Sequence, residues 1–187
     1  MDVFCRDLRQ QFENAADFTA RTLTAAGLDC TLFFLDGLCA GAEIAEFVIR
    51  PLAGLPAPLS PAALLDWALR GGVEAASASL CPDADAAAAK LLGGCCVLAV
   101  PGAGAAAFEV KSGEKRGVSE PEVESTTRGP KDAFTETART NTALLRRHLR
   151  TPRLRLWESS VGRVSRTGDT RRSVHFWRKS CGRRSQR

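Results

Sequence analysis

Apolar residues recur at helical spacing at the start of the chain and then gather into a short continuous run. The recurrence includes Phe4, Leu8 and Phe12 and continues to Leu23, just before Gly27. An apolar stripe of this period predicts an amphipathic helix over residues 2–26, either unbroken or broken near Asn14, with the glycine as its stop signal. Residues 30–35 are almost all apolar and end at an Asp-Gly pair. A run of that length between turn signals predicts a buried strand.

The next eighty residues alternate between helical patterns and breakers. A helix is predicted over residues 42–49, and it should end there because Pro51 follows. A Pro-rich connector then covers residues 52–59. Ser60 and Pro61 supply a cap and a first-turn proline for a helix over residues 62–69. A short strand is expected over residues 73–79. Asp83 or Asp85 then caps an Ala-rich helix that ends at a Gly-Gly pair.

Two further apolar runs, residues 95–100 and 105–110, are separated by a turn of proline and glycine. They predict a β-hairpin on the edge of a small sheet. The turn sequence Gly102-Ala103-Gly104 lacks the continuation of a nucleotide-binding loop, so we interpret it as a turn alone. The expected fold class is α/β, a small mixed sheet packed with helices and followed by the start of a second α/β subdomain.

A polar, aperiodic stretch over residues 111–128 precedes a clear helical pattern that Gly129-Pro130 introduces. Its apolar face includes Phe134, Leu145 and Leu149, with acidic residues first and basic residues last, as the helix dipole favours. A Thr-Pro pair at 151–152 ends this helix, and a strand is expected over residues 154–157. We therefore predict a first subdomain over 1–118, a linker over 119–130, the start of a second subdomain over 131–167 and a basic tail over 168–187.

Charge and composition indicate which partners and which cellular compartment to expect. The net charge is +5, but residues 168–187 carry seven basic residues against one acidic residue, so the rest is nearly neutral. The most apolar stretch, residues 86–108, contains a lysine, a proline and several glycines, and we expect no transmembrane segment. The charged first eleven residues lack a signal peptide's apolar core, which predicts a reducing cytosol.

Candidate chemistry is sparse. The seven cysteines show no C-x-x-C pair and no histidine at zinc-ligand spacing, so we expect thiols that fill the core, no metal and no cofactor. Two histidines and scattered cysteines do not assemble a nucleophile, a base and an orienting group. We therefore expect a protein that is not an enzyme.

The sequence E-P-E-V-E-S-T-T-R-G-P-K-D-A-F-T-E-T-A-R-T-N-T-A-L-L-R over residues 120–146 resembles the signature of the GerA family of spore germination proteins. The family pattern is E-P-x-x-E-x-x-x-R-G-P-[RK]-x-x-F-x-E-x-x-x-x-N-x-x-L-[IL]-R, and thirteen positions match it in one register. The matching residues are Glu120, Pro121, Glu124, Arg128, Gly129, Pro130, Lys131, Phe134, Glu136, Asn141, Leu144, Leu145 and Arg146. Weaker similarity extends over about residues 10–167 and then stops, as in a truncated member.

The resemblance implies the soluble N-terminal part of a nutrient germinant receptor A subunit, which binds and couples a signal and catalyses no reaction. Its implied partners are membrane and lipoprotein subunits of the receptor and a small-molecule nutrient germinant, without specific nucleic acid. The family lies in the spore inner membrane with this region cytosolic. The alternative is a small cytosolic binding protein whose basic tail contacts nucleic acid. The tail over residues 168–187 is itself interpreted either as a disordered extension or as a segment that binds RNA or an anionic lipid surface.

The candidate binding residues come from the matched pattern, and each keeps two interpretations. Asn141 lies on the apolar stripe, where its amide either ties the helix to a neighbouring backbone or contacts a ligand. Arg128 either pairs with carboxylates among Glu120, Glu122 and Glu124 to lock the loop, or joins Lys131 and the free amides of the helix start to hold an anion. The alternating glutamates 120, 122 and 124 are either solvated and Arg-paired or carboxylates for metal binding or acid/base work. Glu136 and Arg146 complete the candidate set.

Overall fold

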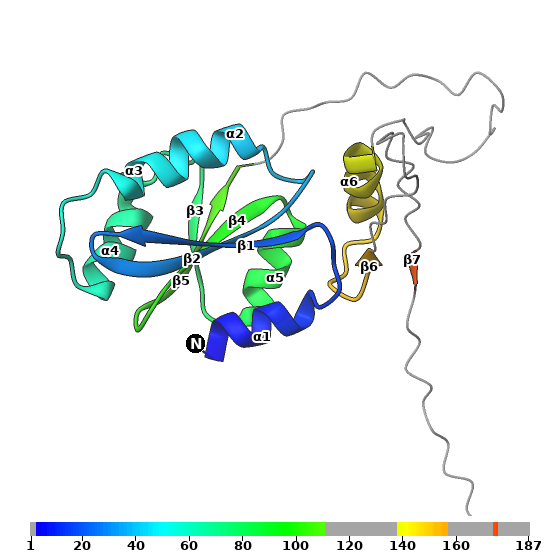
Figure 1. Ribbon diagram of the computed structural model, residues 1–187, viewed down its shortest axis with the longest axis horizontal. Coiled ribbons are helices and arrows are strands. Elements are labelled where there is room, and N and C mark those ends of the chain that lie inside the picture. Colours follow the sequence, from blue (N-terminus) through cyan, green and yellow to red (C-terminus); the bar gives the residue numbers. More distant parts are fainter. Residues whose placement is uncertain (1–2, 111–137, 157–173, 176–187) are drawn as a thin grey trace, which may run out of the picture.

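The computed structural model describes residues 3–110, 138–156 and 174–175 (Figure 1). A five-stranded sheet in the order β1-β2-β4-β5-β3 forms the centre, and each pairing in it is antiparallel. The strands are β1 Phe18–Ala25, β2 Leu28–Leu35, β3 Ala78–Cys81, β4 Cys95–Val100 and β5 Gly104–Glu109. The α/β class is confirmed, with strands that are antiparallel throughout instead of mixed in direction.

Helices cover both faces of this sheet. One face carries α1 Val3–Gln11 and α5 Ala84–Leu92. The other carries α2 Gly41–Glu43, the π-helical η1 Ile44–Ile49, α3 Arg50–Ala53, α4 Pro61–Trp67 and η2 Ala68–Gly72. Beyond the end of the sheet lie α6 Ala138–His148 and the short strands β6 Arg155–Leu156 and β7 Val174–His175 (Figure 1).

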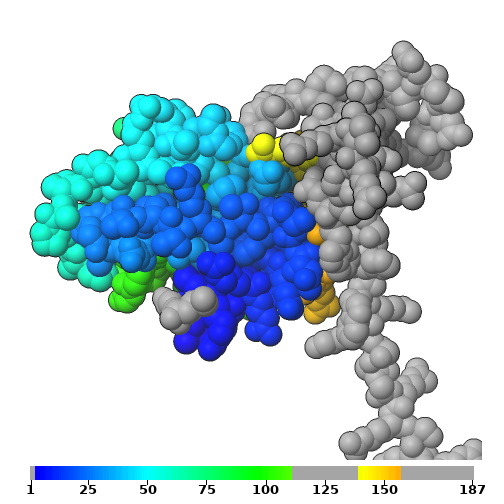
Figure 2. Space-filling model, in the orientation of Figure 1, coloured from blue at the N-terminus to red at the C-terminus, as the bar shows by residue number. Residues whose placement is uncertain are grey.

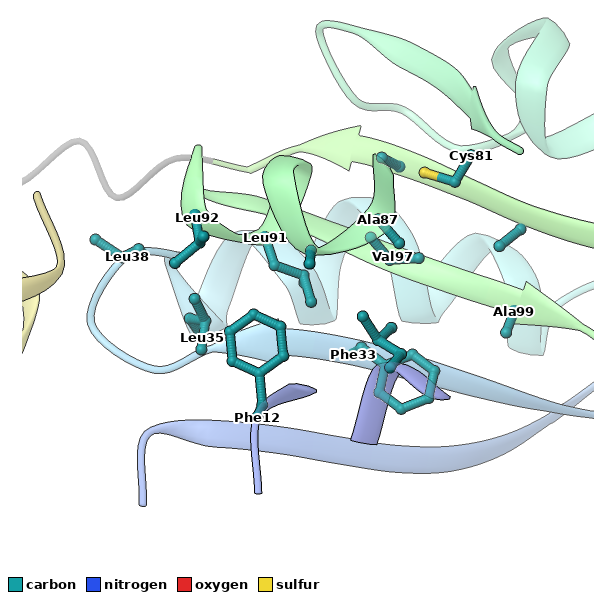
Figure 3. Close-up of a cluster of buried hydrophobic side chains, with 14 of the residues drawn as sticks. Phe12, Phe33, Leu35, Leu38, Cys81, Ala87, Leu91, Leu92, Val97 and Ala99 are labelled. Carbon is teal, nitrogen blue, oxygen red and sulfur yellow. The ribbon is translucent and has the colours of Figure 1, made fainter. Parts of the chain in front are cut away.

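Two apolar layers hold the sheet between its helices. In β4, Val97 and Ala99 point into the layer under α1 and α5, whereas Cys96 and Leu98 point into the layer under α4. Figure 3 shows the first layer, where the ring of Phe12 lies beside Leu91 of α5. Because successive strand residues face opposite sides and both sides are covered, these strands are continuous apolar runs.

The helix predicted over residues 2–26 is wrong in its second half. The helix ends at Gln11, and residues 18–25 form β1, which pairs with β2 over its whole length. Its sequence F-T-A-R-T-L-T-A is rich in threonine, a β-branched residue that suits a strand. Ala26 and Gly27, with φ of 49° and 84°, form the two-residue hairpin turn, so this glycine does not end a helix.

Three smaller expectations also change. The β4-β5 hairpin lies inside the sheet, and β1 and β3 are its edges. The third strand lies at Ala78–Cys81, later than the predicted 73–79. Pro51 does not stop its helix: the helical backbone continues from the π-helical segment into α3, where the proline occupies the first turn.

The predicted caps and the strands over 30–35 and 95–100 are confirmed. The side chain of Ser60 accepts a hydrogen bond from the Ala63 N–H, and Asp83, not Asp85, accepts one from the Ala86 N–H. The strand predicted over 154–157 is present as Arg155–Leu156 within the described residues.

Candidate functional site

A buried ion pair joins α6 to the turn between α1 and β1. The Nε and Nη2 atoms of Arg146 donate to the two carboxylate oxygens of Asp17 at 2.7 and 2.8 Å. Nη1 of the same guanidinium donates to the backbone carbonyl of Thr151 at 3.0 Å. Arg146 is 0% exposed and Asp17 is 6% exposed. Two parallel charge-assisted bonds in a site shielded from water fix both position and orientation of the helix.

Local sequence places each member of this pair. Asp17 comes directly before β1, and its backbone carbonyl accepts from the Asp36 N–H at 2.8 Å, so the sheet ladder holds it. On α6, Thr142, Ala143 and Arg146 are all buried. Arg146 lies three residues after Ala143 and four after Thr142, so all three share one face of the helix. This is the face that α6 packs against the first α/β unit.

The guanidinium of Arg146 also ends a column of aromatic rings. Its Cζ lies 5.9 Å from the centre of the Phe12 ring. Phe12 stacks on Phe18 at 4.8 Å, and Phe18 stacks on Phe33 at 5.7 Å. At the far end, Cζ of Arg9 lies 5.4 Å from the Phe33 ring. The column runs from α6 through the α1-β1 turn into the sheet, and each cation contributes a favourable contact with a ring face.

Contacts on either side of the ion pair complete the docking surface. The backbone N–H of Ala16 donates to the Leu156 carbonyl at 2.9 Å, and Nη1 of Arg155 donates to the Gln11 carbonyl at 3.1 Å. Arg139 pairs with Asp36 at the end of β2. A Cβ on Gly37 would meet the Arg139 carbonyl at 3.1 Å, a tight contact, so glycine at this position lets α6 approach without displacement.

The structure brings together only part of the predicted site. Arg146 is at the centre of the docking surface, and Asn141, five residues before it on the same helix, is half-buried. The remaining candidates, Glu120, Glu124, Arg128, Lys131 and Glu136, lie outside the described residues. Sequence reasoning missed Asp17, because the helix predicted over residues 2–26 includes it and the start of β1 was not recognised. The signal that was available is a lone acidic residue directly before a threonine-rich strand.

A shallow groove of about 430 Å³ lies where α5 meets the segment after α6. Its lining residues are Gln11, Asp85, Ala88, Ala89, Leu92, Gly93, Arg150 and Pro152. Nε2 of Gln11 donates to Asp85 at 2.6 Å along its wall. The groove depends on the docked position of the 150–152 segment, which Arg146 holds through the Thr151 carbonyl.

The thiols of the described residues are poor candidates for chemistry. The six described cysteines form no disulfide, and all but Cys95 are buried. Burial raises the pKa of Cys30 to about 11 and that of Cys39 to about 12, so both stay protonated at neutral pH. No cluster of three or more potential metal ligands occurs within the described ranges. What the site can do is hold one element of the chain on another.

The family model for the Bacillus/Clostridium GerA spore germination protein matches residues 6–169. The chain belongs to the GerA family. The resemblance drawn from the residues 120–146 is thereby confirmed, and the match includes the α/β unit, α6 and the ion pair between them.

Two proteins of Bacillus subtilis (strain 168) are similar to this chain in sequence. Stage V sporulation protein AF is 33% identical over 152 residues, which is 81% of this chain and 31% of that protein. Spore germination protein B1 is 32% identical over 134 residues, 71% of this chain and 27% of that protein. The chain therefore spans about a third of the length of these relatives.

The fold also has a solved counterpart. It is similar to the N-terminal domain of the A subunit of the Bacillus megaterium spore germinant receptor GerK3, with a TM-score of 0.61 and 19% identity. The similarity covers 86% of this chain and 59% of that one. At 19% identity this structural similarity is evidence for the fold alone. In the described part of the chain, no helix is both long and apolar enough to cross a membrane.

Proposed function

We propose that this GerA family chain is the N-terminal part of a nutrient germinant receptor A subunit, where it binds and couples a signal without catalysis. The observation that carries the proposal is the buried pair of Asp17 and Arg146. Arg146 belongs to the helix that bears the end of the family pattern, and Asp17 belongs to the first α/β unit. A signal that moves this helix must therefore also move the α1-β1 turn, or break the pair.

The proposal includes the predicted division of the chain. The first subdomain covers residues 1–118, the linker over 119–130 is the hinge, and residues 131–167 begin a second subdomain. Polar segments with proline and glycine are common hinges between packed units. In this scheme Glu120, Glu124, Arg128 and Lys131 set the state of the hinge, and Asn141 and Arg146 read it out on α6.

The remaining parts of the proposal concern the receptor as a whole. The partners would be the other receptor subunits, of membrane and lipoprotein type, and the signal a small-molecule nutrient. The complex would lie in the spore inner membrane, with this region on the cytosolic side. The names of the relatives support a role in germination.

The test is genetic and uses a spore-forming host that carries this chain. Deleting its gene should slow germination in response to at least one nutrient, and the wild-type gene should restore the rate. Arg146→Met should fail to restore it, whereas Arg147→Met, an exposed neighbour on the same helix, should succeed. Immunoblots of the spores establish that the variants are present in equal amounts. Unchanged germination after deletion, across a panel of nutrients, would refute the proposed function.

A further inference from the structure

The outer edge of β1 presents a row of backbone groups to the surface. In an antiparallel pair, alternate residues direct both their N–H and their C=O toward the neighbouring strand. The Asp17 carbonyl accepts from Asp36, which shows that the odd-numbered positions face β2. The even-numbered residues Ala20, Thr22 and Thr24 therefore direct their backbone groups outward.

Nothing within the described residues covers these groups. No hydrogen bond reaches the outward N–H or C=O of Ala20, Thr22 or Thr24 from any described part of the chain. Thr22 and Thr24 are exposed, and β1 runs across the front surface of the molecule (Figure 2). An uncovered strand edge is a template for pairing with another strand.

Arg21 is the one charged side chain of β1, and the other features that usually protect an edge strand are missing here. Residues 18–25 contain no proline, no lysine and no bulge, since all eight residues pair in one unbroken register with β2. The opposite edge, β3, has only four residues. On β1 the half-buried Ala20 and Leu23 lie at the rim of the two apolar layers. A further strand would extend both layers and cover them.

The chain already adds a strand to the continuation of this edge. Leu156 of β6 bridges to Ala15 in the parallel direction, and its carbonyl accepts from the Ala16 N–H. This edge thus pairs with a strand before Asp17, and after Phe18 no other described part of the chain pairs with it. The free part is long enough for one more short strand.

We propose that the free edge of β1 pairs with the same edge of a second copy of this chain, antiparallel and centred on Thr22. A twofold axis normal to the sheet sets one residue opposite itself and keeps the two faces of the sheet on the same sides. Centring on Thr22 places Ala20 opposite Thr24 of the second copy and Arg21 opposite Leu23. Centring on Arg21 would instead oppose two guanidinium groups, which is unfavourable, whereas threonine pairs across strands are favourable.

Sedimentation velocity of the full 187-residue chain at increasing concentration tests this pairing. The wild type should shift from monomer to dimer. Thr22→Pro should remain monomeric, because it removes an outward N–H while the ladder to β2 loses nothing. Thr22→Val, which keeps the strand propensity and the backbone, should dimerise like the wild type. Circular dichroism spectra and melting curves establish that both variants fold.

Cross-linking tests the register and needs no proline. In the proposed dimer the two Thr22→Cys positions lie about 5.5 Å apart between Cα atoms, within disulfide range. The two Thr24→Cys positions are offset by four residues, about 13 Å along the strand. Under oxidised glutathione, Thr22→Cys should therefore give a cross-linked dimer well above the wild-type background, and Thr24→Cys should not. A wild-type chain that is monomeric at every concentration, a dimer that Thr22→Pro leaves intact, or equal cross-linking at both positions would each overturn the proposal.

Discussion

The unit over residues 3–110 and the segment over residues 138–156 are held in place by different kinds of contact. The first unit is a sheet between two layers of buried apolar side chains. The second buries a few apolar residues, Ala143, Leu154 and Leu156, and is otherwise positioned by one fully buried ion pair and several backbone hydrogen bonds.

That difference determines how each region responds to change. Apolar burial is roughly proportional to area and has no preferred direction, so truncating one side chain of such a layer destabilises the unit as a whole and releases no single element. A buried guanidinium has one geometry that satisfies it, and its loss leaves a carboxylate without a partner in a site shielded from water. The docking of α6 should therefore be lost selectively when the ion pair is broken, as a coupling element requires.

The largest effect is expected for Arg146→Met, which leaves Asp17 buried and unpaired. The free energy of unfolding should fall by about 3–5 kcal/mol. Urea titration measures the loss, and hydrogen exchange should show that the amides of α6 lose protection first. Arg147→Met is the matched control, since Arg147 is exposed, and it should change stability by no more than about 0.5 kcal/mol. Equal losses for the two variants would mean that the ion pair does not hold α6.

Leu64→Ala tests the other side of the comparison. Leu64 is fully buried in the layer under α4, away from α6, and its truncation should cost about 2–5 kcal/mol. Hydrogen exchange should show the loss spread over the sheet, without selective exposure of α6. Leu80→Ala is the control, because Leu80 is 56% exposed and should have little effect. Selective loss of α6 protection in Leu64→Ala would contradict the separation of the two regions.

Gly37→Ala isolates the approach of α6 to the end of β2. Gly37 has a φ of +87°, and a non-glycine residue in the left-handed region costs about 1–2 kcal/mol. Gly71→Ala carries a similar backbone penalty at a φ of +101°, but its new Cβ would meet nothing within 4 Å. Gly37→Ala should therefore lose more stability than Gly71→Ala, and the excess measures the contact with Arg139. Equal losses in thermal unfolding would show that α6 does not press on this turn.

The last expected effect, which is absent at neutral pH, is a dependence of stability on alkaline pH. Desolvation raises the pKa of Cys30 to about 11 and that of Cys39 to about 12, above the ordinary value of 9.0. Above pH 9 the unfolded chain loses thiol protons that the folded chain keeps, so the free energy of unfolding should fall as pH rises from 9 to about 11. Urea titrations under reducing conditions measure this slope, and Cys39→Ala should reduce it. A slope identical to that of the wild type would show that the Cys39 thiol is not desolvated.

Much of the first unit was predictable, because its signals are local. The strand over residues 95–100, the Ser60 cap and the Ala-rich helix each depend on neighbouring residues and appear where expected. The error over residues 2–26 arose because F-T-A-R-T-L-T-A fits a helical period about as well as a strand, and only pairing with β2 decides between them. Propensity is a weak guide wherever tertiary contacts compete with it.

By itself the sequence determined the α/β class, the alternation of helices and strands, and membership of the GerA family through the pattern over residues 120–146. Tertiary structure alone decided that Arg146 is buried and that its partner is Asp17, 129 residues away. A basic residue near the end of a helix is ordinarily a solvated charge that favours the helix dipole. Whether it is buried instead depends on which distant carboxylate the fold places beside it, and no local pattern in the chain encodes that distance.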